Sequence, residues 1–220
     1  MELWLVRHGE SMNNAGAELT DPPLSDLGRR QAAALGAALA ATRFEAIFCS
    51  HLTRAVQTAA AVASRQAPPP PLRVDPALAE CGTPAEPAPS PALLSETYPS
   101  LSFVSLQTPS FPDDAARAAD CLRRLVYPRA FDAGFDHMKL DRTYTVEWRE
   151  ADLLIVAHGT FNAYLIAGLM GFPLDRERLI LSQENACVSR FSLFRVNGKD
   201  RVRVRCLNDR SYLRQPPPPE

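Results

Sequence analysis

The sequence of 220 residues lacks three features that would each assign it to a special class of protein. No apolar run reaches the roughly 18 residues that a membrane span needs, and no basic stretch followed by an apolar run marks a leader peptide. The formal net charge is -1, so the chain has no overall basic field that would attract nucleic acid or an anionic membrane. We therefore expect a cytoplasmic protein whose partners are neither nucleic acid nor membrane.

Paired cysteines are missing as well. The five cysteines are scattered, and none belongs to a Cys-x-x-Cys pair, so we expect neither a disulfide framework nor a zinc site. His51 lies close after Cys49, but no further ligand is spaced nearby. Cys49 also lacks the arginine-containing loop of the cysteine phosphatases. The sequence therefore predicts no metal site.

Short apolar runs and amphipathic stretches, in contrast, alternate along the chain. The runs at 2–7, 44–50 and 152–157 predict buried strands, and the stretches from 25 to about 41 and from 52 to 64 predict helices. One stripe of the first helix contains Leu27, Gln31, Leu35 and Leu39. Strands and helices that alternate at this spacing are typical of a parallel sheet covered by helices.

The middle of the chain breaks this alternation. Residues 67–112 contain more than half of the twenty prolines, which disfavours regular structure, and residues 113–127 then regain a helical pattern. The length allows one large domain. We therefore expect a single domain over 1–214, with an irregular insertion at about 83–150 and a Pro-rich tail at 215–220.

The last part of the chain returns to regular patterns. A helix over 161–171 is expected to end at Gly171, shortly before Pro173. The alternating stretches 187–196 and 201–207 flank an Asn-Gly pair, which is the strongest local signal for a hairpin turn.

Two of the predicted strands end in the same way. His8 and His158 each follow an apolar run and precede a glycine, which lets a ligand approach the backbone closely. A single histidine of this kind is more often a satisfied polar residue at a strand end. Ligands of parallel sheets bind beyond the carboxyl ends of the strands, so two matched histidines favour a shared site.

Two arginines add positive charge at the same place. Arg7 directly precedes His8, and Arg54 lies in the first turn of the helix predicted after the second strand. An arginine is unfavourable at the positive end of a helix dipole, so its position predicts an anionic partner. Two arginines, two histidines and a helix N-terminus would together bind a phosphoryl group.

These residues resemble the motifs of the histidine phosphatase superfamily, which has the phosphoglycerate mutase-like fold. The matching stretches are RHGES at 7–11 with Asn14, DPPLSDLGRRQA at 21–32, CSHLTRAVQTA at 49–59, Glu80, VAHG at 156–159, and ENACVSRF and LNDRSYL near the end. The resemblance implies an α/β fold, a three-layer sandwich with a mainly parallel central sheet flanked by helices. It places the irregular Pro-rich insertion near the active site.

The resemblance also implies a role for each matching residue. His8 would be the nucleophile that forms a phosphohistidine, and Glu80 the general acid that protonates the leaving group and then activates water. The phosphoryl oxygens would be held by Arg7, Asn14, Arg54, His158 and the backbone of Gly159. These basic groups take the place of magnesium, so no metal or other cofactor is implied, and the expected partner is a small phosphorylated substrate.

The sequence departs from the family pattern after Glu80, where many members continue with Trp-Glu-Gly and this chain has CGTPAEP. Glu86 is a competing candidate for the acid. We expect substrate specificity to lie in the insertion. Four residues there are candidates for a second contact with the anionic substrate: His137, Lys139, Arg142 and Arg149. Residues of these types are more often solvated surface residues than ligands.

Three functions are compatible with these motifs. The first is a metal-independent phosphomonoester hydrolase that acts through phosphohistidine. The second is a phosphoglycerate mutase-type phosphotransferase, which shares the first half-reaction, although the mutases resembled here usually have tryptophan where this chain has Asn13. The third is a phosphate-binding regulatory module without efficient turnover, which the altered segment after Glu80 motivates.

Overall fold

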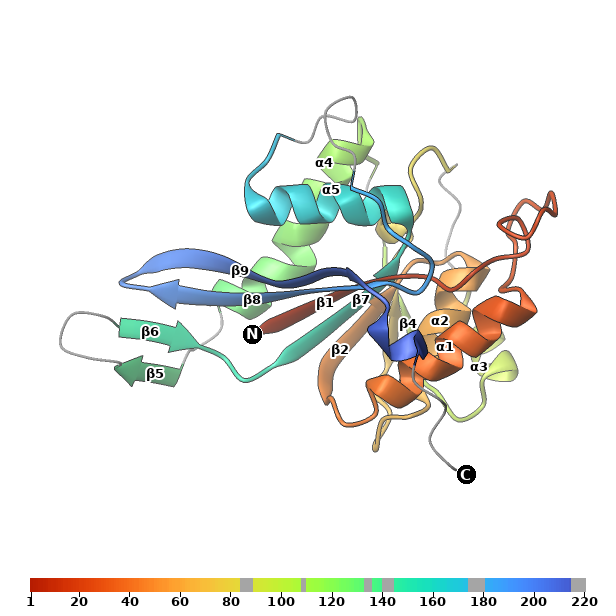
Figure 1. Ribbon diagram of the computed structural model, residues 1–220, viewed down its shortest axis with the longest axis horizontal. Helices are drawn as coiled ribbons and strands as arrows, with labels where there is room; N and C mark the ends of the chain where they lie inside the picture. Colours follow the sequence, from red (N-terminus) through yellow and green to blue (C-terminus); the bar gives the residue numbers. More distant parts are fainter. Residues whose placement is uncertain (84–88, 108–109, 133–135, 140–144, 174–180, 215–220) are drawn as a thin grey trace.

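The computed structural model describes residues 1–83, 89–107, 110–132, 136–139, 145–173 and 181–214. Its centre is a sheet of nine strands in the order β4-β3-β2-β7-β1-β8-β6-β5, with β9 paired to β8 (Figure 1). Five neighbouring strands are parallel: β4 (Phe103–Ser105), β3 (Leu72–Val74), β2 (Phe44–Cys49), β7 (Asp152–Ala157) and β1 (Glu2–Arg7). The antiparallel strands are β8 (Val188–Val196), β9 (Lys199–Asp209), β6 (Thr145–Trp148) and β5 (Asp136–Lys139).

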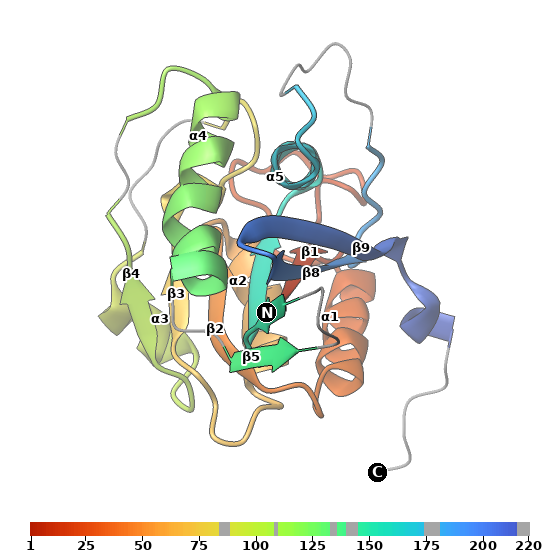
Figure 2. The ribbon, with the colours of Figure 1, turned by 90° about the vertical axis from the view of Figure 1, so that its left-hand side faces the viewer.

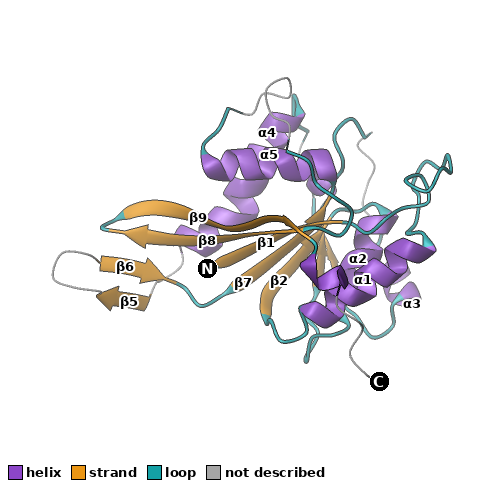
Figure 3. Cartoon of the chain, in the orientation of Figure 1, coloured by secondary structure: helices purple, strands orange, loops and turns teal. Residues whose placement is uncertain are grey.

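Helices cover both faces of this sheet (Figure 3). Figure 2 shows α4 (Asp114–Cys121) and α5 (Gly159–Met170) on one side of the strands and α1 (Asp26–Ala38) on the other. Helix α2 (Thr53–Ala63) packs beside α1, and the short helix α3 (Pro91–Thr97) lies near the β4 edge. The expected α/β fold with a mostly parallel central sheet is confirmed.

The strand β7 shows how one apolar run serves two hydrophobic cores. Leu153 and Ile155 belong to the cluster that contains residues of α4 and α5, whereas Leu154 and Val156 belong to the cluster that contains residues of α1 and α2. All four side chains are at most 1% exposed. Successive strand residues point to opposite faces, so a strand buried on both sides must be apolar throughout.

Helix α1 begins at the predicted residue, because the Ser25 hydroxyl accepts a hydrogen bond from the Gly28 N–H at 3.1 Å. The predicted leucine stripe is wrong at its first position, since Leu27 is 42% exposed. Gly28 lies on the buried face instead, where a Cβ would come within 1.9 Å of the Glu10 carbonyl oxygen. The close approach of the chain after β1 therefore sets the buried face of the helix.

The described part of the segment 83–150 contains regular elements, where its prolines predicted an irregular insertion. Its described part contributes β4, which pairs with β3 in parallel, and α3, whose Leu94 is buried in the same core as Leu101 and Phe103. It also contributes α4 and the π-helical turn Leu122–Val126, which pack beside α5, and the turn Pro128–Asp132, which packs beside β8. Packing against the sheet overrides the local signal of the prolines, most of which lie between these elements.

The C-terminal hairpin is confirmed. Strands β8 and β9 pair around Asn197 and Gly198, whose φ angles of 50° and 72° are those of a two-residue hairpin turn. The predicted tail at 215–220 lies outside the described residues. Among the helices that the structure describes, none is both long and apolar enough to cross a membrane.

Candidate active site

Three parallel strands bring the predicted residues to one edge of the sheet. Arg7 at the end of β1 pairs with Ala157 at the end of β7, so the residues that follow, His8 and His158, lie side by side. Their ring centroids are 5.0 Å apart, and the residues are 3% and 0% exposed. The end of β2 lies beside the end of β7 and leads directly into α2, which carries Arg54.

The tautomer of His8 follows from its hydrogen bonds. Its Nδ1 lies 2.6 Å from the carbonyl oxygen of Gly9, and a carbonyl oxygen only accepts, so Nδ1 carries the proton. Nε2 then keeps its lone pair, to which the Nε of Arg54 donates at 3.2 Å. The nitrogen that would attack phosphorus is thus unprotonated and already adjacent to a guanidinium.

Arg54 has an anionic partner within the chain that the sequence did not predict. Its guanidinium lies 3.7 Å from the carboxylate of Asp21, which also accepts hydrogen bonds from the backbone N–H and the hydroxyl of Thr53 at the start of α2. Asp21 therefore compensates the helix dipole and orients the arginine. Burial lowers the pKa of Arg54, while the nearby charges of Asp21 and Glu80 act in the opposite direction.

Arg7 is held from two sides. One terminal nitrogen donates to the backbone carbonyl of Gln183, and the guanidinium lies against Gly159, where a Cβ would be 3.4 Å from its Nε. Gly159 is the first residue of α5. The absence of a side chain there lets Arg7 lie at the helix N-terminus, where both would attract an anion.

Glu80 also lies at the N-terminus of α5. Its carboxylate accepts hydrogen bonds from the backbone N–H groups of Phe161 at 3.1 Å, Thr160 at 3.4 Å and Cys81 at 2.9 Å. The competing candidate Glu86 lies outside the described residues. The structure therefore brings Glu80 to the helix that begins directly after His158.

Asn14 is oriented by a residue that the sequence reasoning did not single out. Its Oδ1 accepts hydrogen bonds from the Ser11 hydroxyl at 2.9 Å and from the Asn185 amide at 3.2 Å. The Asn185 amide also donates to the carbonyl oxygen of His8 at 3.4 Å. Asn14 can therefore direct its own Nδ2 away from Ser11 and Asn185. In the sequence, the signal for Asn185 was the motif ENACVSRF, which contains it.

Several polar atoms at this edge are buried without a hydrogen-bond partner among the described residues. They are the Nε of Arg7, both ring nitrogens of His158, and both amide atoms of Asn162. Buried polar groups are nearly always hydrogen-bonded in folded proteins, so a cluster of unsatisfied ones indicates a ligand. Asn162, one turn after His158 on α5, was missed in the sequence, where its signal is a single amide within an apolar helix.

Burial and neighbouring charges keep both histidines neutral. Burial, reinforced by Arg54 and Arg7, lowers the pKa of His8 from 6.5 to about 3. The pKa of His158 is also well below 6.5, first through burial and then through the charges of His8, Arg54 and the buried His51. Both rings therefore stay neutral at neutral pH, and His8 remains a nucleophile in weakly acidic solution.

These shifts predict that the fold loses stability in acid. The unfolded histidines take up protons as the pH falls through 6.5, whereas folded His8 stays neutral until about pH 3. Between these values the unfolded state binds more protons, so the free energy of unfolding should fall by about 1.4 kcal/mol per pH unit for each such histidine. Urea unfolding between about pH 6 and about pH 4.5 measures this slope. His158→Asn should make the slope shallower, and an unchanged slope would contradict the assignment.

Other candidates lie elsewhere. The Arg149 guanidinium binds Glu45 and the carbonyl of Arg129 at the amino ends of β2 and β7, the opposite end of these strands from His8 and His158. Strand β5, which carries His137 and Lys139, is also at the amino end of β1. Arg142 lies outside the described residues. Among the residues that the structure describes, no His, Cys, Asp and Glu side chains form a group of three that could hold a metal.

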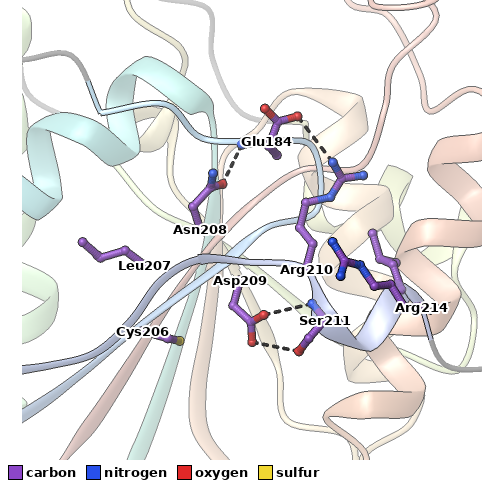
Figure 4. Close-up of a pocket in the computed structure, with 9 residues that line it drawn as sticks. Glu184, Cys206, Leu207, Asn208, Asp209, Arg210, Ser211 and Arg214 are labelled. Carbon is purple, nitrogen blue, oxygen red and sulfur yellow. Dashed lines mark hydrogen bonds and ion pairs between the residues drawn. The ribbon is translucent and has the colours of Figure 1, made fainter.

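One cavity of about 770 Å³ is separate from this set of residues. Figure 4 shows that residues at the end of β9 and the following turn line it, together with Glu184. The polar groups there bind one another: Arg210 pairs with Glu184, and Ser211 donates to Asp209. None of the predicted site residues lines this cavity, so its polar groups do not indicate the reaction centre.

The sequence profile of the histidine phosphatase superfamily (branch 1) matches residues 3–126, which is more than half of the chain. The chain belongs to the histidine phosphatase superfamily. It is therefore a histidine phosphatase-type hydrolase, and the matched range contains Arg7, His8, Arg54 and Glu80.

Individual relatives agree with this family. A glucosyl-3-phosphoglycerate phosphatase of Mycolicibacterium vanbaalenii is 29% identical over 189 residues, which cover 84% of this chain and 80% of the relative. Fructose-2,6-bisphosphatase TIGAR B of Danio rerio is 48% identical over 61 residues, which cover 26% of this chain and only 24% of that protein. The structure of a mycobacterial glucosyl-3-phosphoglycerate phosphatase in complex with VO3 shares the fold, with a TM-score of 0.62 and 23% identity over 94% of this chain and 98% of that one.

Proposed function

We propose that this histidine phosphatase hydrolyses the phosphomonoester of a small phosphorylated metabolite through a phosphohistidine at His8, without a metal. The observation that carries the proposal is the pair of hydrogen bonds on the His8 ring. Nδ1 donates to the Gly9 carbonyl, and Nε2 presents its lone pair beside Arg54. Such a ring is a fixed, neutral nucleophile next to a group that binds phosphoryl oxygens.

In the first step, Nε2 of His8 attacks phosphorus in line with the ester oxygen. The bond from phosphorus to that oxygen breaks as the bond to Nε2 forms, and the Glu80 carboxyl group gives its proton to the leaving oxygen. Arg7, Arg54 and His158 lie where they can donate to the equatorial oxygens and offset their charge. Nδ1 keeps its proton and goes on donating it to the Gly9 carbonyl oxygen, which stabilises the positive ring of the phosphohistidine.

In the second step, water attacks the phosphohistidine. Glu80 accepts a proton from this water, the bond between Nε2 and phosphorus breaks, and inorganic phosphate leaves. The names of the curated relatives, which refer to a phosphorylated glyceric acid derivative and a sugar bisphosphate, support a small phosphorylated metabolite as the substrate class.

The deciding experiment measures steady-state hydrolysis of p-nitrophenyl phosphate and a panel of natural phosphomonoesters in EDTA. Turnover that releases inorganic phosphate in EDTA supports the proposal, and the panel ranks sugar phosphates against phosphorylated acids. Activity that requires a bisphosphate primer would indicate the mutase reaction instead. Tight binding of vanadate without turnover of any substrate would indicate a binding module.

Glu80→Gln is expected to lower kcat for alkyl phosphates by roughly 10²–10⁴-fold, because general-acid catalysis contributes about this much. The loss for p-nitrophenyl phosphate should be much smaller, since its leaving group needs little protonation. Comparing kcat for the two substrates measures the difference. Glu45→Gln, at the opposite end of β2, is the matched control and should change neither rate, whereas equal losses in Glu80→Gln would argue against an acid role.

A further inference from the structure

Arg117 on α4 contacts the stretch of chain that directly precedes Glu80. One terminal nitrogen donates to the carbonyl oxygens of Ala77 at 3.0 Å and Ala79 at 2.8 Å. Its other terminal nitrogen pairs with Asp114 at 2.6 Å. The Arg117 side chain is only 12% exposed, so these bonds are largely shielded from competing water.

One of these carbonyls lies within the short 3-10 turn that leads into Glu80, and the other directly follows it. This turn spans Pro76–Leu78, and Ala79 is the residue directly before the glutamate. The last carbonyls of a helical turn have no partner within it, and Arg117 supplies one. Its hydrogen bonds therefore fix the backbone from which the Glu80 side chain extends.

The same guanidinium also contacts the helix that receives the carboxylate. Its central carbon lies 4.3 Å from the centroid of the Phe161 ring, in the range of a cation–π contact. Phe161 is the residue whose backbone N–H donates to the Glu80 carboxylate at 3.1 Å. One side chain thus links the backbone before Glu80 with the N-terminus of α5.

Asp114 completes this arrangement on the other side of Glu80. After burial, the charge of Asp114, the partner of Arg117, is the largest cause that raises the pKa of the Cys81 thiol. The Arg117–Asp114 pair therefore acts on both chain neighbours of Glu80, through a hydrogen bond at Ala79 and through charge at Cys81. Helix α4 comes from the segment where the sequence departs from the family motifs, so none of these motifs contains the pair.

We propose that Arg117 is a positioning residue that sets the place of the Glu80 carboxyl group relative to the leaving oxygen. The inference rests on the proposed function, in which Glu80 is the general acid. Proton transfer needs its donor within hydrogen-bond reach of the leaving group, and a shift of about 1 Å can cost roughly 100-fold in rate. Arg117 acts only through Glu80 and leaves the attack by His8 intact.

The test compares Arg117→Met and Arg117→Lys with wild type on an alkyl phosphate and on p-nitrophenyl phosphate. We expect Arg117→Met to lower kcat for the alkyl phosphate by at least about tenfold more than for the aryl phosphate, with KM nearly unchanged. Arg117→Lys, which keeps the charge and donors, should recover part of the alkyl activity. Arg123→Met is the matched control, because Arg123 lies in the π-helical turn directly after α4 and its side chain is 71% exposed.

A double variant separates positioning from a general loss of stability. If Arg117 acts through Glu80, Arg117→Met should cost little further alkyl activity in a Glu80→Gln background. Thermal unfolding checks each protein, and Arg117→Lys carries the comparison if Arg117→Met does not fold.

Three results would overturn the inference. The first is an equal loss of kcat on both substrates in Arg117→Met. The second is a pair of losses that multiply in the double variant. The third is an Arg117→Lys protein that folds with wild-type activity on both substrates while Arg117→Met also keeps the wild-type ratio of the alkyl and aryl rates. Failure of the proposed function is distinguishable, because wild type would then turn over neither substrate, and the inference would be overturned with it.

Discussion

His8→Ala is expected to lower kcat for every phosphomonoester by at least about a thousand-fold, because it removes the atom that forms the covalent intermediate. No other described group has the same geometry. His158 lies beside His8, but its two ring nitrogens lack the carbonyl contact that fixes the tautomer of His8. Substitution of His8 should therefore leave no substitute nucleophile.

Rapid quenching with a ³²P-labelled substrate measures the intermediate itself. Wild type should carry acid-labile, base-stable phosphate, and His8→Ala should carry none. His137→Ala is the matched control, since β5 lies at the other end of the sheet from His8. Retention of most activity by His8→Ala, or labelling of a different residue, would refute a phosphohistidine at this position.

Arg54→Ala is expected to lower kcat/KM by roughly 10³-fold, because a guanidinium that neutralises a transferring phosphoryl group contributes at least this much. In the free protein its Nε donates to Nε2 of His8. We expect the phosphoryl oxygens to take over this donor when substrate binds, so that Nε2 is released for attack. The substitution should thus reduce both binding of inorganic phosphate and the rate of the chemical step.

The same variant should change the pH dependence. The charge of Arg54 contributes to the low pKa of His8, so its removal should raise that pKa and move the acidic limb of kcat/KM to higher pH. Arg54→Lys keeps the charge but lacks the planar guanidinium, so its kcat/KM should lie between those of wild type and Arg54→Ala. Arg65→Ala, exposed just beyond the end of α2, is the control. An unchanged kcat/KM in Arg54→Ala would place this arginine outside the phosphate site.

Local patterns in the sequence were sufficient to predict the strands whose carboxyl ends carry the candidate site. The apolar runs predicted β1, β2 and β7, and the Ser25 cap and the Asn197-Gly198 turn were found where their local chemistry predicted them. Each of these signals is carried by adjacent residues whose backbone preferences do not depend on distant contacts. Long-range packing decided the cases that failed, as at Leu27, which a close contact of Gly28 with Glu10 turns to solvent.

The sequence by itself therefore determined the histidines, arginines and glycines of the candidate site, because they stand at or just after the ends of recognisable strands. Only the tertiary structure decided how they are held. Asp21 orients Arg54, the Gln183 carbonyl anchors Arg7, and Arg117 fixes the turn before Glu80. The residues in each of these contacts are far apart in sequence, and no local preference encodes a distance between side chains that meet only when the sheet and its helices have packed.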